Sequence, residues 1–210
     1  MNDKTSKLKQ TIDYYDREAK NWTSAHGGNQ GDSYWKDEMK KFHKLLPSGK
    51  VLEIGSGAGK DAAALIALGY DYTGTDASEG LLQVAIKRNP GARFVHMAVN
   101  NLNLPGEEFD GFWTAATLLH IPKDKIDNAL IKIKSVLKPE AVGFISVKAG
   151  AGERTDPQTD RWFAYYSQKE FHEVLGRNGF EVIEEETRKG EKDWWLIFFI
   201  KVRENYEGRS

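Results

Sequence analysis

Three glycines at alternate positions form the most chemically informative segment of this 210-residue chain. Gly55, Gly57 and Gly59 follow residues 51–54, a short apolar run that reads as a buried strand. A glycine has no β-carbon, so glycines at this spacing expose bare backbone on which a ligand can lie. One glycine here would more often mark a plain tight turn into a helix. Three of them favour a ligand-binding loop.

The residues around the glycines indicate which class of ligand the loop can bind. A dinucleotide fingerprint needs a third glycine three residues after the second, and Lys60 occupies that position. A Walker-type phosphate loop needs Gly-Lys-Ser/Thr, which the sequence lacks. Glu53, two residues before the first glycine, would repel a pyrophosphate but suits a ligand with an ammonium group.

A second carboxylate follows the next predicted strand. Asp76 lies 21 residues after Gly55, at the end of residues 70–75. Its oxygens only accept hydrogen bonds, so they can take both hydroxyls of a ribose. An isolated aspartate at this position is usually a helix cap, but Ser78 can cap the helix that follows. The pattern therefore favours a ribose-binding role for Asp76.

Alternating strand and helix patterns must position these residues. We predict strands at residues 51–54, 70–75, 93–97, 109–115, 142–148, 180–187 and 194–202, and helices at 60–68, 78–88, 123–137 and 168–177. The repeated strand–helix–strand order implies an α/β fold with a mostly parallel, doubly wound sheet. The last two strands form a C-terminal antiparallel hairpin. Ligands of such sheets bind at the carboxyl ends of the strands.

The segment before the first strand differs from the rest. Residues 1–50 are polar with scattered aromatic side chains, and residues 11–22 and 33–46 look helical. We expect residues 1–50 to form a helical lid or cap on the ligand-binding domain, residues 51–210. The two parts should make a single compact unit.

Composition excludes several classes of chemistry. The 30 Lys and Arg residues against 31 Asp and Glu residues offer no overall electrostatic footprint for nucleic acid. The absence of cysteine excludes disulfides, thiolate metal sites and cysteine nucleophiles, and the five histidines are too scattered to predict a metal site. The longest apolar run has seven residues, whereas a membrane-spanning helix needs roughly 20. We expect a cytoplasmic protein with no membrane partner.

The glycine loop and its spaced acid resemble the cofactor half of class I S-adenosylmethionine-dependent methyltransferases. Glu53 to Gly59 match the motif E/D-x-G-x-G-x-G, and Asp76 matches the ribose-binding acid. The resemblance continues through NLNLPGEEFDGFWTAATLLHIP, VLKP and GFISVK, and covers roughly residues 12–202. It implies a Rossmann-like, seven-stranded sheet and a methyltransferase that converts S-adenosylmethionine into S-adenosylhomocysteine.

The resemblance also assigns cofactor-binding roles. The glycine loop would line the methionine part with Glu53 behind it, Asp76 would hold the ribose, and aromatic residues of the first helix, Tyr14, Tyr15 and Trp22, would form a lid. Docking of these aromatic residues onto the sheet is an equally good interpretation. The full expected set is Tyr14, Trp22, Glu53, Gly55, Ser56, Gly57, Gly59, Asp76, Ala77, Ser78, Ala98, Val99, Asn100, Thr114 and Ala115.

The chain departs from the family's pattern at the adenine. Relatives often carry an acidic residue after the third strand, near the adenine amino group, and Ala98 stands there in this chain. Backbone groups or Asn100 can read the adenine instead, because an amide side chain both donates and accepts hydrogen bonds.

The candidate acceptor pocket contains four residues, His120, Lys148, Arg161 and Tyr165. His120, at a strand end near the methyl group, can contact the acceptor or act as a general base, or it can merely order its own loop. After the fifth strand, a pliable segment resembles a methyltransferase subgroup with K-x-G-x-G-E and R-W/Y-F-x-Y-Y. Its Lys148 and Arg161 can hold a carboxylate or phosphate, and Tyr165 can donate a hydrogen bond. An ordinary packed loop is the alternative.

Methyl transfer from a sulfonium starts with an activated leaving group, so the protein mainly positions the reactants and excludes water. Only residues 1–50 and 149–166 remain to recognise an acceptor, which favours a small molecule. We expect a monomer or a homodimer. A nucleic-acid or protein methyltransferase, and a cofactor-binding regulator without catalysis, are the alternatives.

Overall fold

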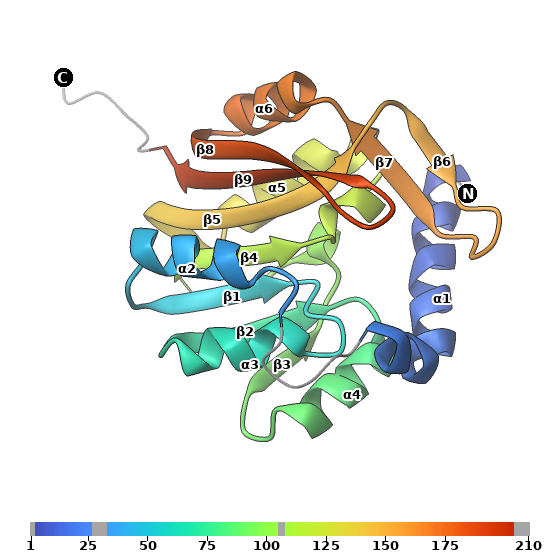
Figure 1. Ribbon diagram of the computed structural model, residues 1–210, viewed down its shortest axis with the longest axis horizontal. Helices are drawn as coiled ribbons and strands as arrows, with labels where there is room; N and C mark the ends of the chain where they lie inside the picture. The colour runs from blue at the N-terminus through green and yellow to red at the C-terminus, as the bar shows by residue number, and fades with distance from the viewer. Residues whose placement is uncertain (1–2, 27–32, 105–107, 204–210) are drawn as a thin grey trace.

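The computed structural model describes residues 3–26, 33–104 and 108–203, which are built around a mixed β-sheet (Figure 1). Its strands are β1 Lys50–Ile54, β2 Asp71–Asp76, β3 Arg93–His96, β4 Phe109–Ala115, β5 Leu137–Ala149, β6 Glu153–Thr155, β7 Trp162–Tyr166, β8 Phe180–Lys189 and β9 Trp194–Val202. Five of them run parallel in the order β3-β2-β1-β4-β5. Beyond β5, β9 pairs antiparallel with β5 and β8 pairs antiparallel with β9. The predicted Rossmann-like sheet with its C-terminal hairpin is confirmed.

Two short strands add to the seven that the sequence predicts. β6 and β7 form an antiparallel hairpin, and β7 extends the end of β5 through the pairs Lys148–Tyr165 and Ala149–Tyr166. The segment reads as a loop in the sequence because β7 is buried on both faces and so shows no alternation of polar and apolar residues. β6 is only three residues long. Tertiary packing, not local pattern, forms this hairpin.

Helices cover both faces of the sheet (Figure 1). They are α1 Asp3–His26, α2 Lys36–Leu45, α3 Lys60–Ala67, α4 Glu79–Arg88, α5 Ile126–Lys134 and α6 Gln168–Arg177, with 3-10 turns η1 Val99–Asn101, η2 Leu118–His120 and η3 Lys123–Lys125. Phe42 of α2 and Leu65 of α3 pack on one face, and Leu130 of α5 and Phe171 of α6 pack on the other. The strands therefore supply core residues to both faces, as a doubly wound sheet requires.

The boundary between α5 and β5 differs from the predicted helix at residues 123–137. Leu137 continues the helical spacing of Ile133, but in the structure it pairs with Phe109 of β4 as the first residue of β5. Pairing with the neighbouring strand overrides the local periodicity at this boundary.

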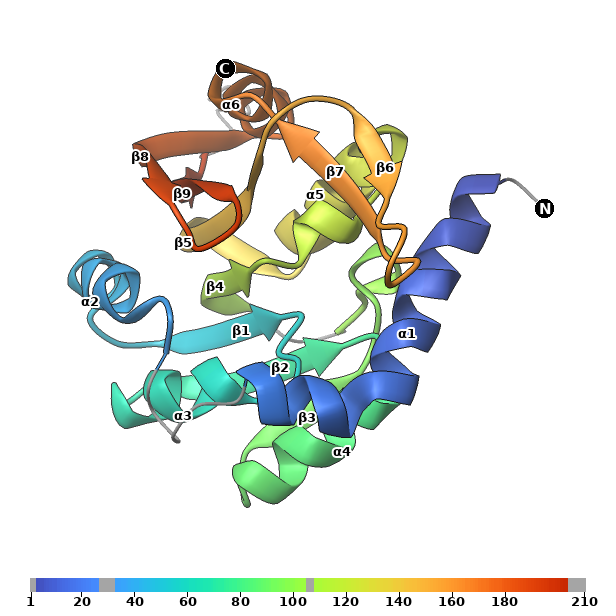
Figure 2. The ribbon, with the colours of Figure 1, turned by 45° about the vertical axis from the view of Figure 1, so that its right-hand side comes forward.

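α1 lies apart from the two helical layers. It runs along one side of the molecule, from the β6–β7 hairpin to α4, near the carboxyl ends of the parallel strands (Figure 2). α2, in contrast, belongs to the core of the sheet, where Phe42 contacts Trp113. Within the described residues, no helix is long and apolar enough to cross a membrane.

Candidate active site

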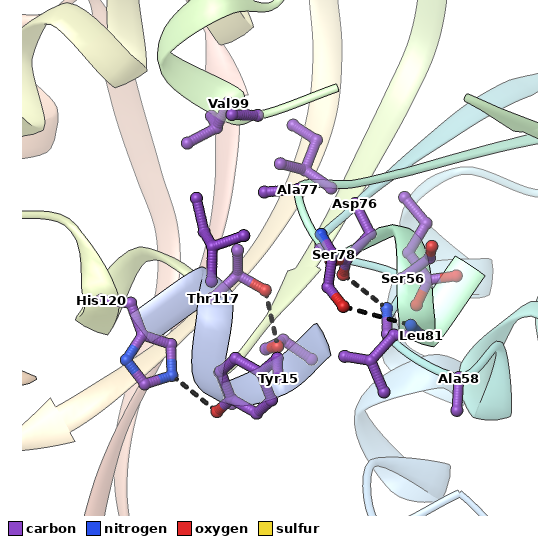
Figure 3. A pocket seen from close by; sticks show the side chains of 18 of the residues that line it. Tyr15, Ser56, Ala58, Asp76, Ala77, Ser78, Leu81, Val99, Thr117 and His120 are labelled. Atoms are coloured by element: carbon purple, nitrogen blue, oxygen red, sulfur yellow. Dashed lines mark hydrogen bonds between the residues drawn. The ribbon is translucent and has the colours of Figure 1, made fainter. Parts of the chain in front are cut away.

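A cavity of about 300 Å³ lies between the glycine loop, the carboxyl ends of the parallel strands and α1 (Figure 3). This volume is at the lower end of the range for small-molecule sites. The sequence-predicted residues that line it are Trp22, Glu53, Gly55, Ser56, Gly57, Asp76, Ala77, Ser78, Ala98, Val99, Asn100, Ala115 and His120. The structure thus brings most of the expected cofactor set, and one of the four acceptor candidates, to one cavity.

Six other candidates lie outside the cavity lining. They are Tyr14, Gly59 and Thr114 of the cofactor set, and Lys148, Arg161 and Tyr165 of the acceptor set. Gly59 takes the left-handed N-cap position of α3, where a β-carbon would approach Ala85 and Asn89 of the α4 region. The role of this third glycine in the structure is therefore close packing of α3 against α4.

The sequence interpretation missed several lining residues. Leu8, Thr11 and Ile12 line the cavity on the same side of α1 as Tyr15, which the sequence already indicates as a lid residue. Their spacing follows the period of a helix, and this signal becomes visible once α1 is known to begin at Asp3 and not near residue 11. Trp35, Asp61, Met97, Ala116, Thr117 and Ile121 also line the cavity.

The backbone of the glycine loop requires glycine for two different reasons. Gly55 and Gly57 have φ angles of +75° and +52°, in the left-handed region that other residues rarely adopt. A β-carbon at Gly55 would overlap the side chain of Thr117, whereas a β-carbon at Gly57 would meet no atom within 4 Å. Gly57 therefore leaves an open face toward the cavity on which a ligand can rest.

Asp76 holds this loop in place from the end of β2. Its Oδ2 accepts a hydrogen bond of 2.8 Å from the backbone N–H of Gly57, and its Oδ1 accepts one of 2.8 Å from that of Ser78. Burial raises the pKa of Asp76, and these two hydrogen bonds oppose the shift. A carboxylate oxygen has two lone pairs, so each oxygen keeps one for a hydroxyl in the cavity.

Two more carboxylates line the same side of the cavity. Glu53 accepts a hydrogen bond from the Tyr72 hydroxyl, and Asp61 accepts one of 3.0 Å from the Trp113 indole. Burial raises the pKa of Glu53 well above its ordinary value, with the charge of Asp61 adding to the shift, and burial also raises the pKa of Asp61. Grouped carboxylates of this kind would be stabilised by a positively charged ligand.

The turn η1 contains a polar atom without a hydrogen-bond partner in the described part of the chain. Asn100 lies there beside Ala98 and Val99, and its Oδ1 is buried without a hydrogen-bond partner among the described residues. A buried acceptor with no partner is costly unless a ligand supplies the donor. An exocyclic amino group of a purine is such a donor.

Both ring nitrogens of His120 form hydrogen bonds. Its Nδ1 lies 2.7 Å from the backbone carbonyl of Trp162, which can only accept, so Nδ1 carries the hydrogen and Nε2 carries the lone pair. The Tyr15 hydroxyl, 2.9 Å away, therefore donates to Nε2 (Figure 3), and it accepts a 2.9 Å hydrogen bond from Arg161 Nη1. Burial lowers the pKa of His120 to about 3, and the nearby charges of Arg161 and Lys148 act in the same direction.

Lys148 and Tyr165 lie behind the cavity wall. Lys148 forms a 2.8 Å ion pair with Asp193, and its ammonium group lies 4.1 Å from the centre of the Phe163 ring. The guanidinium of Arg154 stacks 3.7 Å from the centre of the Tyr165 ring. Both residues thus support the wall that carries His120.

α1 is hydrogen-bonded to the structures on both sides of the cavity. On one side, Oδ1 of Asp16 accepts from the Ser78 hydroxyl at 2.7 Å and from the Gly80 backbone at 2.9 Å, at the start of α4. On the other side, the Thr11 hydroxyl accepts from the backbone N–H of Trp162 in β7 at 2.9 Å. The middle of the helix is therefore attached to both sides of the cavity, like a strap across it.

No group of three or more potential metal ligands occurs among residues 3–26, 33–104 and 108–203. The polar groups around the cavity are arranged to bind an organic ligand through hydrogen bonds and charge.

The sequence of this chain matches known proteins mainly in the part that contains the glycine loop and Asp76. Residues 51–140 match the family described as a methyltransferase domain. The demethylmenaquinone methyltransferase of Clavibacter sepedonicus is 28% identical over 113 residues, which cover 51% of this chain and 44% of that protein. The match thus spans less than half the length of this curated relative.

Solved structures extend the likeness to nearly the whole chain. The 1,6-didemethyltoxoflavin-N1-methyltransferase of Burkholderia thailandensis, solved with its named substrate and S-adenosylhomocysteine, has a TM-score of 0.67 at 22% identity and covers 92% of this chain and 91% of its own. The cyclase SpnF has a TM-score of 0.73 at 17% identity, covering 93% and 97%. These likenesses concern the fold, and the fold alone does not fix the reaction.

Proposed function

Because this chain has the fold of class I S-adenosylmethionine-dependent methyltransferases and matches a methyltransferase domain over residues 51–140, we propose that it transfers a methyl group from S-adenosylmethionine to a small-molecule acceptor. The observation that carries the proposal is the combined geometry of Gly57 and Asp76. The open face of Gly57 and the free lone pairs of Asp76 meet at one side of the cavity.

The residues around the cavity fit this cofactor. Asp76 can accept both ribose hydroxyls, and the unpartnered Oδ1 of Asn100 can accept a hydrogen bond from the adenine amino group. The carboxylates of Glu53 and Asp61 favour the ammonium and sulfonium charges of the methionine part. In this chain Ala98 stands where relatives often carry an acidic residue, and Asn100 would bind the adenine amino group instead.

When bound, the cofactor supplies a methyl group on a sulfonium, which needs no further activation. The task of the chain is to bind, orient and exclude water. α1 covers the cavity, with Tyr15 and Trp22 on its inner side. His120 remains neutral, and its Nε2 accepts a hydrogen bond from the Tyr15 hydroxyl, so His120 fixes the orientation of Tyr15 on the cavity wall.

The size and closure of the cavity favour a small acceptor. Among the described residues, a volume of about 300 Å³ under a helix attached on both sides fits a small molecule better than a nucleic-acid strand or a folded protein. Residues 1–50 and 51–210 act in this proposal as cap and cofactor-binding domain, with α1 as the part of the cap that covers the site.

Calorimetry with S-adenosylmethionine tests the cofactor. The wild-type chain should bind it, and Asp76→Ala should weaken binding by at least ~1 kcal/mol because the ribose loses its acceptors. Asp71→Ala, at the exposed opposite end of β2, is the matched control and should bind normally. No binding at millimolar ligand would refute the cofactor, and an unchanged dissociation constant for Asp76→Ala would refute its ribose role.

A metabolite screen by mass spectrometry, scored for the gain of one methyl group, tests the reaction. Product formation with a small acceptor supports the proposal. Cofactor binding without turnover over a broad panel of small molecules, nucleic acids and proteins would instead favour a regulator that only binds the cofactor.

A further inference from the structure

A buried tyrosine outside the cavity lining holds one of the cavity carboxylates. Tyr72 of β2 is 6% exposed and does not line the cavity, but its hydroxyl donates a hydrogen bond to Oε2 of Glu53. Glu53 is also buried, and it lines the cavity. Tyr72 can therefore act on a ligand in the cavity only through the carboxylate that it holds.

The second oxygen of the Glu53 carboxylate is available to a ligand. The hydrogen bond from Tyr72 uses Oε2, and Oε1 has no hydrogen-bond partner within the described ranges. Oε1 is also not one of the enclosed unpartnered atoms, so it has access to open space. Because Glu53 lines the cavity, that space is the cavity. One oxygen is thus fixed by the protein and the other faces the ligand site.

The neighbouring carboxylate of Asp61 is occupied on both oxygens. Its Oδ1 accepts a 2.8 Å hydrogen bond from the Ser33 hydroxyl, and its Oδ2 accepts one of 3.0 Å from the Trp113 indole. Of these two carboxylates, Glu53 is therefore the one that keeps an oxygen without a partner. An ionised carboxylate with a free oxygen is a strong partner for an ammonium group.

A glycine in β2 makes room for the contact between Tyr72 and Glu53. Residues two apart in a strand share a face, so the Tyr72 side chain and position 74 lie on the same face of the sheet. Gly74 is the register partner of Glu53, and a β-carbon at Gly74 would lie 2.4 Å from the Tyr72 hydroxyl oxygen. The Tyr72 ring also packs edge-on against Phe94 of β3, with 5.7 Å between the ring centres. The tyrosine hydroxyl thus occupies the space that a side chain at position 74 would fill.

The groups that face Glu53 make this hydrogen bond important for its charge. Burial raises the pKa of Glu53 most, and the charges of Asp61 on α3 and Asp76 on β2 add to the shift. The hydrogen bond from Tyr72 lowers the pKa of Glu53 and so opposes both effects. Lys60 also lines the cavity, and its charge lowers the pKa of Asp61. Tyr72 is therefore the described group that favours the ionised form of Glu53.

We propose that Tyr72 is a positioning residue for cofactor binding, which holds Glu53 with Oε1 toward the cavity and keeps it ionised for the ammonium group of S-adenosylmethionine. This inference rests on the proposed function and adds a residue that does not touch the ligand. When the pH falls and Glu53 takes up a proton, the cofactor should bind less tightly. Loss of the Tyr72 hydroxyl should move this weakening to higher pH.

Calorimetry with S-adenosylmethionine between about pH 5.5 and pH 8 tests the inference. Tyr72→Phe removes only the hydroxyl and should raise the midpoint of the affinity loss by roughly one pH unit. The ligand has the same ionisation state in both proteins at each pH, so the comparison reports on the protein. Tyr70→Phe is the matched control, because it removes the hydroxyl of another buried tyrosine, which donates to the Leu46 carbonyl. It should keep the wild-type midpoint.

Glu53→Gln shows whether Tyr72 acts through the carboxylate. This variant should lose the pH dependence that Glu53 causes, and Tyr72→Phe should not shift whatever pH dependence remains in the Glu53→Gln background. A wild-type pH profile in Glu53→Gln overturns the inference. So does an unchanged midpoint in Tyr72→Phe, or an affinity loss in Tyr72→Phe that is equal at every pH, because such a loss reports a structural role only. Thermal melting checks that each variant folds.

A carbon-13 NMR titration of the Glu53 carboxyl group in the ligand-free protein separates this inference from the proposed function. The titration midpoint of Glu53 should rise in Tyr72→Phe and stay at the wild-type value in Tyr70→Phe. If the wild type binds no S-adenosylmethionine, the methyl-transfer proposal fails, and with it the ligand assigned to Glu53. A Glu53 midpoint that is equal in the wild type and Tyr72→Phe overturns the positioning role by itself.

Discussion

At the residue scale, the three glycines of the loop differ in what an added β-carbon would meet. Gly55 faces Thr117, Gly59 faces the α4 region and Gly57 faces the open cavity. Substitutions at the first two positions would disturb the protein itself. A substitution at Gly57 would mainly disturb the ligand.

Gly57→Ala should therefore separate stability from binding. The left-handed backbone should cost the folded state about 1–2 kcal/mol, and the added methyl group should weaken S-adenosylmethionine binding at least tenfold. Gly91→Ala is the matched control, because Gly91 also has a positive φ and open space around it, but lies in the loop before β3. Calorimetry and urea unfolding of both variants measure the two effects. Equal affinity in the two variants would contradict the assigned position of the ligand.

His120 should make folding stability depend on pH. Its pKa falls to about 3 in the folded chain but is about 6.5 when unfolded, so below pH 6.5 the unfolded state binds a proton that the folded state does not. The stability that the wild type has over His120→Gln is fully present above pH 6.5. It should shrink by about 1–2 kcal/mol as the pH falls from 7 to 5.

Urea unfolding at both pH values measures the difference in unfolding free energy between the wild type and His120→Gln. The buried carboxylates contribute equally to both proteins, so their opposing pH dependence cancels in this difference. His172→Gln replaces an exposed histidine of α6 and provides the comparison. A difference that stays constant between pH 7 and pH 5 would mean that His120 is not held neutral.

Sequence reasoning reached the residues whose role follows from local chemistry. Ser78 caps α4 through Leu81 as predicted, and Asp76 stands at the strand end where the spacing places it. Asp61 was harder to assign from sequence. Asp61 reads as an ordinary acid in the first turn of a helix, and only the approach of Trp113 from β4 shows that it is buried.

At the element scale, α1 and the β6–β7 hairpin are the parts that local patterns describe least well. α1 has no apolar face broad enough to mark its first turns, because one side covers a cavity and not a core. The hairpin depends on pairing with β5 and on rings supplied by α1. Elements that exist to enclose a site are specified mainly by their partners.

Gly80→Ala tests the contact between α1 and α4. Alanine favours a helix by about 1 kcal/mol over glycine, but its β-carbon would lie 2.8 Å from the backbone oxygen of Asp16 and 3.2 Å from Ala19. We expect faster amide hydrogen exchange along α1 and several-fold weaker S-adenosylmethionine binding. Gly176→Ala in α6 is the control, because its β-carbon meets only Arg203, at 3.9 Å. Gly176→Ala should stabilise the chain by up to ~1 kcal/mol. Unchanged amide exchange in α1 of Gly80→Ala would contradict the role of the α1–α4 contact in holding α1 over the cavity.

At the scale of the whole molecule, a partly buried ion pair joins segments 150 residues apart in the sequence. Glu38 of α2 is 3% exposed and accepts a hydrogen bond from Arg188 of β8, whose guanidinium also lies 4.8 Å from the centre of the Trp35 ring. Burial raises the pKa of Glu38. No local pattern predicts this pairing, because it depends on how the last hairpin folds back across the sheet.

Removal of one partner of this pair should be much more damaging than removal of both. Arg188→Met leaves Glu38 buried without a counter-charge and should cost about 3–5 kcal/mol. The double variant Glu38→Leu/Arg188→Met should recover to within about 1 kcal/mol of the wild type. Asp127→Asn, which breaks the exposed pair with Arg177, should cost at most ~1 kcal/mol. Urea unfolding measures all three, and additive losses in the double variant would contradict coupling within the pair.

The attachment of α1 on both sides of the cavity has a thermodynamic consequence for the two ligands of the proposed reaction. A ligand that holds α1 against α4 also holds Thr11 and Tyr15 against the β7 side, because one rigid helix carries all these contacts. The ordering of α1 then costs free energy once, at the first binding event, and the second ligand binds to a helix already in place. Under the proposed function, the methyl donor and the methyl acceptor should therefore raise each other's affinity by the same factor.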